Sequence, residues 1–251
     1  MNERRLEGKT AVVTGSGGDM GGHIALRLAG LGANIVLNDR IAGRAERFAE
    51  SVRACGADVL VVEGSVLRPP VVDEMITAAE RRWGGVDVLV NNVGGIKGPI
   101  SRHVWEMSDD EWDATVAVNL RGMFLCTRRV LPGMMERGCG TIVNIASVAW
   151  GGEPVHAAYA TSKAGVVSFT RSVATSVGPH GITVNAVAPG LTATGVLERM
   201  SEVDRSDAPN PLGRVNEPDD IAEAVLYLVS PGARNVSGQL ITVAGGWNPA
   251  L

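Results

Sequence analysis

The chain has 251 residues, of which 45% are hydrophobic and 20% charged, and its net charge is −4. These proportions are typical of a globular protein with a buried core and argue against intrinsic disorder. Acidic and basic residues are mixed along the chain without a basic block, so we expect no nucleic acid partner. We also expect no membrane span and no secretory leader, because no apolar run is long and uninterrupted enough.

The cysteines and the other metal-binding residue types form no familiar site. Cys55, Cys126 and Cys139 are odd in number and far apart, which is typical of unpaired thiols in a reducing cytoplasm. The chain has no His-Glu-x-x-His motif, no Cys/His cluster and no carboxylate pair, so we expect no bound metal.

Short apolar runs rich in β-branched residues alternate with helical patterns along the whole chain. The runs are Thr10–Thr14, Ile35–Leu37, Val59–Val62, Val86–Val90, Thr141–Ile145, Ile182–Val187 and Leu240–Val243. Runs that are apolar throughout are typical of parallel strands covered on both faces.

The segments between these runs carry apolar residues at helical spacing, as at Ile24, Leu28 and Leu31. About seven strands separated by helices predict an α/β fold, a single Rossmann-type doubly wound parallel sheet with helices on both faces. No linker divides the chain, so we expect one domain over residues 1–251. The least regular stretch, residues 191–215, is long for a compact domain and is predicted to be a substrate-loop segment.

The first run leads into the glycine-rich segment Thr14-Gly15-Ser16-Gly17-Gly18-Asp19-Met20-Gly21-Gly22, and a helical pattern follows. Glycines allow a sharp turn and a close approach of the backbone to a pyrophosphate. The free N–H groups of the helix N-terminus then face that anion. This placement predicts a dinucleotide-binding turn.

The second run ends near Asp39, about 20 residues beyond the glycines, where an acidic residue accepts hydrogen bonds from a free adenosine ribose. Its charge would repel a 2′-phosphate, and the glycine turn carries no Lys or Arg. Both features favour NAD over NADP. Arg40 argues the other way, since a guanidinium pairs with phosphate.

Several motifs in one order resemble those of the short-chain dehydrogenase/reductase family over nearly the whole chain. They are the turn with Thr14, Gly15 and Gly21, Asn91-Asn92-Val93-Gly94, Asn119, Ser147, Tyr159-x-x-x-Lys163, and Pro189-Gly190 followed by Thr194. The resemblance implies a nicotinamide cofactor and an oxidoreductase. The implied cofactor contacts are Gly15, Asp19, Met20, Gly21, Asp39, Ser65, Asn91, Gly94, Tyr159, Lys163, Pro189, Gly190, Thr192 and Thr194.

Three positions depart from the family pattern. Asp19 replaces the middle glycine of the turn, and we expect its carboxylate to turn away from the pyrophosphate and cap the following helix. Ser65 stands where the family often has an adenine-binding aspartate and keeps only a hydroxyl acceptor. Ala244 replaces the acid common before the C-terminal Gly-Gly, where we expect a local effect.

Reduction of a ketone needs a hydride from nicotinamide and a proton for the oxygen, and oxidation of an alcohol needs the reverse. Tyr159 is expected to transfer that proton, its pKa near 10 lowered by Lys163 one helical turn away. Ser147, at the end of the fifth run, is expected to donate to the substrate oxygen. The resemblance implies that Asn119 holds a relay water and that Lys163 binds the nicotinamide ribose.

The sequence thus predicts a cytoplasmic, NAD-dependent secondary-alcohol dehydrogenase or ketoreductase. Val196, Leu197 and Met200 favour an alicyclic, aromatic or acyl substrate, and His156 is a candidate for the substrate pocket. One alternative is an NADP-dependent reductase of 3-oxoacyl thioesters, and another is a non-catalytic dinucleotide-binding sensor. The resemblance also implies a homotetramer, with one interface from helices around residues 110–137 and 157–178.

Overall fold

The computed structural model describes residues 6–195 and 210–247. Within these residues seven strands form one parallel sheet, in the order β3-β2-β1-β4-β5-β6-β7. The strands are β1 (Thr10–Thr14), β2 (Asn34–Asp39), β3 (Val59–Glu63), β4 (Val88–Asn91), β5 (Gly140–Ile145), β6 (Ile182–Pro189) and β7 (Leu240–Val243). Each agrees with its predicted apolar run to within two residues at either end, which confirms the parallel sheet.

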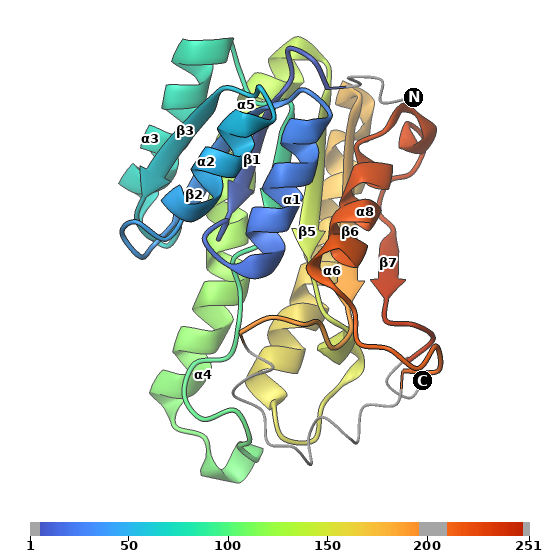
Figure 1. The fold of residues 1–251 in the computed structure, drawn as a ribbon. Coiled ribbons are helices and arrows are strands. Elements are labelled where there is room, and N and C mark those ends of the chain that lie inside the picture. Colours follow the sequence, from blue (N-terminus) through green and yellow to red (C-terminus); the bar gives the residue numbers. More distant parts are fainter. Residues whose placement is uncertain (1–5, 196–209, 248–251) are drawn as a thin grey trace.

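Helices cover both faces of the sheet, as the sequence predicts (Figure 1). They are α1 (Asp19–Gly30), α2 (Glu46–Ala54), α3 (Pro69–Trp83), α4 (Asp109–Val116), α5 (Gly122–Arg137), α6 (Ala157–Val177) and α8 (Pro218–Leu228). One core cluster joins α1, α2 and α8 to the sheet, and a second joins α3, α5 and the end of α6 to its other face.

Strand β1 shows why the runs are apolar at every position. Val12 and Val13 are both fully buried, yet they belong to the clusters on opposite faces of the sheet. Successive side chains of a strand point to opposite faces, so a strand with helices on both sides needs apolar residues throughout.

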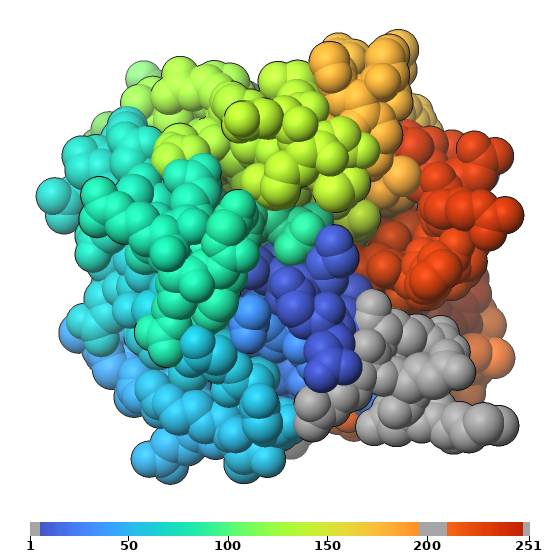
Figure 2. Space-filling view, turned by 90° about the horizontal axis from the view of Figure 1, so that it is seen from above, coloured from blue at the N-terminus to red at the C-terminus, as the bar shows by residue number. Residues whose placement is uncertain are grey.

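The carboxyl ends of the strands share one edge of the sheet, which faces downward in Figure 1 with α4 below it. Figure 2 views the molecule from the opposite end. There the first part of the chain lies centrally, between the elements near residues 50–90 and the C-terminal elements. This agrees with the central place of β1, and the strand order reverses between β1 and β4. Ligands of doubly wound folds bind at the carboxyl edge beside such a reversal.

Candidate active site

The glycine turn after β1 packs tightly against its own backbone. Gly15 has φ of 65°, and the Gly18 N–H donates to the Gly15 carbonyl oxygen at 3.1 Å. A Cβ atom on Gly21 would lie 2.5 Å from that oxygen, which is closer than a carbon atom approaches a non-bonded oxygen. The turn therefore requires glycine at Gly21. It leaves the start of α1 open at the carboxyl edge, where backbone N–H groups suit a pyrophosphate.

Asn92, the residue after β4, holds the glycine turn from the neighbouring strand. Its side-chain amide donates to the Thr14 carbonyl oxygen at 2.9 Å and to the Gly15 carbonyl oxygen at 3.2 Å. Its backbone N–H donates to the Thr14 hydroxyl oxygen at 3.0 Å. Asn92 was not among the predicted site residues, although it stands inside the motif that contains Asn91 and Gly94.

The prediction that Asp19 caps helix α1 is wrong. Gly18 occupies the N-cap position and no side chain accepts a hydrogen bond there. Asp19 is the first residue of the helix instead, and its carboxylate accepts from the Gly195 N–H at 3.0 Å. A residue inside the first turn cannot reach back as an N-cap, so its carboxylate serves a segment distant in sequence. The following residue, Met20, packs against the core cluster around α1.

Asp39 ends β2 and is 6% exposed, with one carboxylate oxygen accepting from the Ile41 N–H at 2.9 Å. Its other oxygen lies against Gly17, since a Cβ there would be 2.7 Å away. This is where an acidic residue meets an adenosine ribose. The structure also brings Arg44 and Arg47 to the turn, where both donate to the Gly17 carbonyl oxygen, at 3.0 and 2.8 Å. The sequence did not predict these two contacts, because Arg44 and Arg47 lie 27 and 30 residues beyond Gly17.

Two further residues predicted to bind the cofactor lie after β3 and in β4. The Ser65 hydroxyl accepts from the Leu67 N–H at 3.3 Å and shapes the loop at the carboxyl edge. The Asn91 amide donates to Asn144 at 2.8 Å and Thr127 at 3.1 Å, inside a buried polar network. The side chain of Asn91 therefore ties β4 to β5, and its contact with a cofactor stays a prediction.

Pro189 ends β6, and the Gly190 N–H continues the sheet by donating to the Val243 carbonyl oxygen at 2.9 Å. A Cβ on Gly190 would lie 2.8 Å from that of Ala244, so glycine is needed there. Thr192 is 8% exposed and donates to the Gly190 carbonyl oxygen at 2.9 Å.

Thr194 follows on the same segment at the carboxyl edge and is half-buried. Its contact with a cofactor stays a prediction. Residues 196–209 of the predicted substrate-loop segment lie outside the described residues, and so do Val196, Leu197 and Met200.

Lys163 and Asn119 meet beside Gly94 after β4. A Cβ on Gly94 would be 2.6 Å from the Asn119 side-chain oxygen and 3.0 Å from the Lys163 Nζ atom. Lys163 is 3% exposed and donates to the Ile145 carbonyl oxygen at 2.8 Å. Because Gly94 has no side chain, the Asn119 side-chain oxygen and the Lys163 Nζ atom can both lie against it. Both residues belong to the predicted catalytic set.

Asn119 lies in a π-helical turn, Ala117–Arg121, between α4 and α5. Its amide donates to the carbonyl oxygens of Gly95 and Thr115, each at 2.8 Å, and its side-chain oxygen accepts from the Gly95 N–H at 3.0 Å. Such turns often mark functional positions inside helices. The sequence predicted helices around residues 110–137 but not the π turn between α4 and α5.

Tyr159 and Ser147 face each other across the loop that precedes α6. Ser147 lies two residues beyond β5, and its hydroxyl forms a hydrogen bond with the Tyr159 phenol. Burial raises the pKa of the phenol above its ordinary value, the Ser147 hydrogen bond partly offsets this, and the charge of Glu153 raises the pKa further.

The prediction that Lys163 lowers the pKa of this phenol is wrong for the structure. The Lys163 Nζ atom lies 5.5 Å from the centroid of the Tyr159 ring and bonds to the Ile145 carbonyl. Burial also lowers the pKa of Lys163 itself, to about 8. Helical spacing brings the two groups together, but the desolvation that opposes their charges follows only from the tertiary packing.

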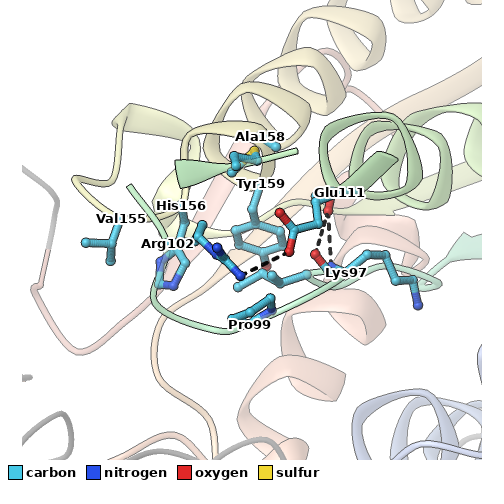
Figure 3. Close-up of a pocket in the computed structure, with 11 residues that line it drawn as sticks. Lys97, Pro99, Arg102, Glu111, Val155, His156, Ala158 and Tyr159 are labelled. Carbon is cyan, nitrogen blue, oxygen red and sulfur yellow. Dashed lines mark hydrogen bonds and ion pairs between the residues drawn. The ribbon is translucent and has the colours of Figure 1, made fainter. Parts of the chain in front are cut away.

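A pocket beside Tyr159 lies between the loop after β4 and the segment leading into α6 (Figure 3). His156 lines it, and its Nε2 atom contacts the Ile100 carbonyl oxygen; its contact with a substrate stays a prediction. Arg102 and Glu111, which the sequence analysis did not single out, line the same pocket and form an ion pair at 3.4 Å. No sequence motif marks them, since the loop and helix that carry them join only in the fold.

The carboxyl edge fits a dinucleotide on its own geometry. The turn at Gly15 and Gly21 leaves the backbone open to a pyrophosphate, Asp39 lies at the end of β2 beside Gly17, and Gly94 adjoins Lys163. Among residues 6–195 and 210–247, no group of three or more His, Cys, Asp or Glu side chains is placed to hold a metal ion. In the same residues no helix is long and apolar enough to cross a bilayer.

Known proteins match this chain over nearly its whole length. A family model described as enoyl-(acyl carrier protein) reductase matches residues 16–248. The BbsD subunit of (2S)-[(R)-hydroxy(phenyl)methyl]succinyl-CoA dehydrogenase from Thauera aromatica is 39% identical, over 96% of this chain and 97% of that protein. The 3-oxoacyl-[acyl-carrier-protein] reductase FabG from Staphylococcus epidermidis is 37% identical, over 95% of this chain and 98% of that protein.

Solved structures agree with these relatives. A 7α-hydroxysteroid dehydrogenase complexed with NADH and 7-oxo glycochenodeoxycholic acid aligns with a TM-score of 0.93 and 31% identity, over 100% of this chain and 98% of that chain. Levodione reductase aligns with a TM-score of 0.90 and 33% identity, over 96% and 98% of the two chains.

The fold, the geometry of the carboxyl edge of the sheet and the relatives together define an NAD(P)-dependent oxidoreductase with a Rossmann-type sheet. The chain belongs to the short-chain dehydrogenase/reductase family.

Proposed function

We propose that this oxidoreductase interconverts a secondary alcohol and a ketone, with Asn119, Ser147, Tyr159 and Lys163 as its catalytic residues. The observation that carries the proposal is their convergence at the carboxyl edge. Lys163 and Asn119 adjoin Gly94, and Ser147 bonds to the Tyr159 phenol, which faces a pocket. The bound nicotinamide supplies or accepts the hydride in this chemistry.

In the direction of reduction, Tyr159 gives its phenolic proton to the carbonyl oxygen of the substrate. Ser147 donates a hydrogen bond to the same oxygen and stabilises the charge that develops there. The raised pKa of Tyr159 keeps the phenol protonated at neutral pH, which suits a proton donor. In the direction of oxidation, the same hydroxyl must first lose its proton, so that direction is expected to gain rate as the pH rises.

The residues proposed to hold the cofactor line the edge from β1 to β6. They are Gly15, Asp19, Met20, Gly21, Asp39, Ser65, Asn91, Gly94, Tyr159, Lys163, Pro189, Gly190, Thr192 and Thr194. Asp19 contributes through its backbone at the start of α1, since its carboxylate is engaged with Gly195.

We propose NAD as the preferred cofactor, because the Asp39 carboxylate stands at the expected position of the adenosine ribose. Separate titrations with NAD and NADP test this. Asp39→Asn keeps the oxygen that accepts from Ile41 but removes the charge, and is expected to raise the affinity for NADP relative to NAD at least tenfold. Glu50→Gln, an exposed change on α2 with the same loss of charge, serves as the control. A wild-type preference for NADP contradicts the proposal.

The second candidate is an NADP-dependent reduction of 3-oxoacyl thioesters. The name of the FabG relatives favours it, and so do the Arg44 and Arg47 guanidinium groups beside Gly17, which suit a phosphate. Turnover of a 3-oxoacyl thioester with NADPH at least tenfold above simple ketones with NADH would decide for this candidate. A non-catalytic sensor is disfavoured by the assembled catalytic set.

The broader test is a panel of alcohols and ketones, followed through the absorbance of the reduced nicotinamide. No hydride transfer in either direction with either cofactor would overturn the proposed activity. A homotetramer and a cytoplasmic location are further proposals, and sedimentation of the purified protein tests the first. A monomer at all concentrations would contradict it.

A further inference from the structure

The pocket beside Tyr159 has one wall that the proposed reaction leaves unused. Arg102 occupies it, on the loop between β4 and α4, and Figure 3 shows its guanidinium between His156 and Glu111. We infer that Arg102 forms a carboxylate-binding subsite, so that the substrate is an oxo acid or hydroxy acid with a hydrocarbon body. The inference rests on the proposed function for the position of the reacting carbon at Tyr159.

The backbone fixes Arg102 on the same wall as the proposed proton donor. The Arg102 N–H donates to the Val155 carbonyl oxygen at 3.1 Å. Val155 and His156 lead directly into α6, which carries Tyr159 in its first turn. This bond ties the loop that carries Arg102 to the segment before Tyr159, and both side chains line the same pocket.

The guanidinium is held in place and retains unused donors. One Nη atom donates to the Glu106 carbonyl oxygen at 3.1 Å, and the other lies 3.4 Å from a Glu111 oxygen. Within residues 6–195 and 210–247 its Nε–H has no acceptor. The side chain is 34% exposed, so a ligand can reach it. Arginine presents its N–H groups as a planar fork that matches a carboxylate.

Glu111 does not occupy all the N–H groups of the Arg102 guanidinium. Its second oxygen accepts from the Ser108 N–H at 2.9 Å in the capping box of α4. The helix cap thus holds the carboxylate so that it touches Arg102 through one oxygen only. Glu111 repels a ligand carboxylate to some degree, while Lys97 places a second cation on the same pocket. The amine of Lys97 points away from Tyr159 in Figure 3, so Arg102 is the group that contacts the ligand.

Besides Thr115 and His156, the remaining lining of the pocket is apolar and suits the carbon skeleton of such an acid. Ile96, Pro99, Met107, Val155 and Ala158 line it. Apolar contact orients the body of the ligand, and one charged anchor selects for the carboxylate, which is the usual division of labour in small-molecule pockets.

The test compares oxo acids with their methyl esters, which keep the ketone but lack the negative charge. We choose 4-oxopentanoate, 5-oxohexanoate and 4-oxocyclohexanecarboxylate. Binding to the wild-type protein is measured calorimetrically with oxidised cofactor, with which a ketone cannot react. At least one acid is expected to bind ten times more tightly than its ester. If none does, the carboxylate subsite is overturned.

Substitutions at Arg102 and at Glu111 then move the acid-to-ester affinity ratio in opposite directions. Arg102→Gln is expected to lower it at least tenfold, with Arg102→Lys intermediate because it keeps the charge but loses the fork. Glu111→Gln retains a capping residue, removes the competing carboxylate and is expected to raise the ratio. Arg53→Gln, which breaks an exposed Arg–Glu pair on α2, is the matched control and is expected to leave the ratio unchanged. A ratio unaffected by Arg102→Gln overturns the inference.

Turnover separates this inference from the proposed function. If the binding ratios behave as expected but no oxo acid is reduced with NADH or NADPH, the subsite stands and the proposed activity fails. If acids and esters are reduced equally well and Arg102→Gln changes neither relative to the other, the activity stands and the subsite fails.

Discussion

The carboxyl edge of the sheet and the pocket wall around Arg102 differ in how they hold their polar groups. Lys163 and Asn119 are 3% and 2% exposed, and the backbone carbonyls of β5, the loop after β4 and α4 fix them. The Arg102 side chain is 34% exposed and is held by one carbonyl and one ion pair on a loop. The rigid edge suits chemistry that must be positioned closely, while the looser wall suits selection among substrates.

If both proposals hold, the determinants of reaction and of substrate lie in separate parts of the chain. Buried groups on strands and helices lose hydrogen bonds when they move, so their substitution is costly. The Arg102–Glu111 pair is only partly buried, and such pairs near the surface contribute little stability, so the wall can change without loss of the fold. The following experiments test the contrast, beginning with the largest expected effect.

Replacing Tyr159 with Phe is expected to reduce turnover by a factor of about 10²–10⁴, because the proton donor is lost while the ring remains. Cofactor affinity, measured by titration, is expected to change little. Tyr227→Phe, at the half-exposed second tyrosine, is the control and should retain activity. Near-normal turnover in the Tyr159 variant would contradict its role.

The buried ammonium of Lys163 is expected to make stability depend on pH. Its folded-state pKa of about 8 lies below the ordinary 10.5, so between those values only the unfolded chain binds the proton and stability rises with pH. At about 1.4 kcal/mol per unit, the full change is on the order of 3 kcal/mol.

Denaturant titrations of wild type and Lys163→Met across this range isolate the effect, since other groups cancel in the difference. Below pH 8 the free energy of unfolding of the wild type should lie below that of the variant by a constant amount. This difference should shrink as the pH rises towards 10.5. A difference that is flat with pH would show that the amine is not desolvated.

Adding a methyl group at Gly21 is expected to weaken cofactor binding and lower stability by about 1–3 kcal/mol, because the new Cβ would overlap the Gly15 carbonyl oxygen. Gly30→Ala lies in the same helix, and its Cβ would meet nothing within 4 Å. That variant should be as stable as the wild type or slightly more so. Equal thermal unfolding and cofactor titrations for the two variants would argue against a tight turn at Gly21.

The smallest expected effect is on the ionisation of Tyr159. The Ser147 hydroxyl lowers the pKa of this phenol, so Ser147→Ala is expected to raise it further. The chain has two tyrosines, so a Tyr227→Phe background leaves one phenol to follow by its ultraviolet absorbance. The pH profile of alcohol oxidation should shift upward with it. A lower pKa after Ser147→Ala would reverse the role of that hydrogen bond.

Much of the fold and of the candidate site could be predicted from the sequence because both depend on local pattern and strand order. The apolar runs marked the strands, and residues that follow parallel strands must meet at one edge. That rule brought Gly15, Asp39, Ser147 and Gly190 to the same edge of the sheet. The wrong predictions, the Asp19 cap and the lowered pKa of Tyr159, concern contacts and burial that depend on distant segments.

By itself, the sequence determined the alternation of strands and helices, the glycine turn and the one-turn spacing of Tyr159 and Lys163, because these follow from backbone geometry over a few residues. Only the tertiary structure decided that Asp19 binds Gly195, that burial opposes the charges of Tyr159 and Lys163, and that Arg102 shares a pocket with Tyr159. Desolvation and long-range contact depend on which elements pack together, and no local spacing records that.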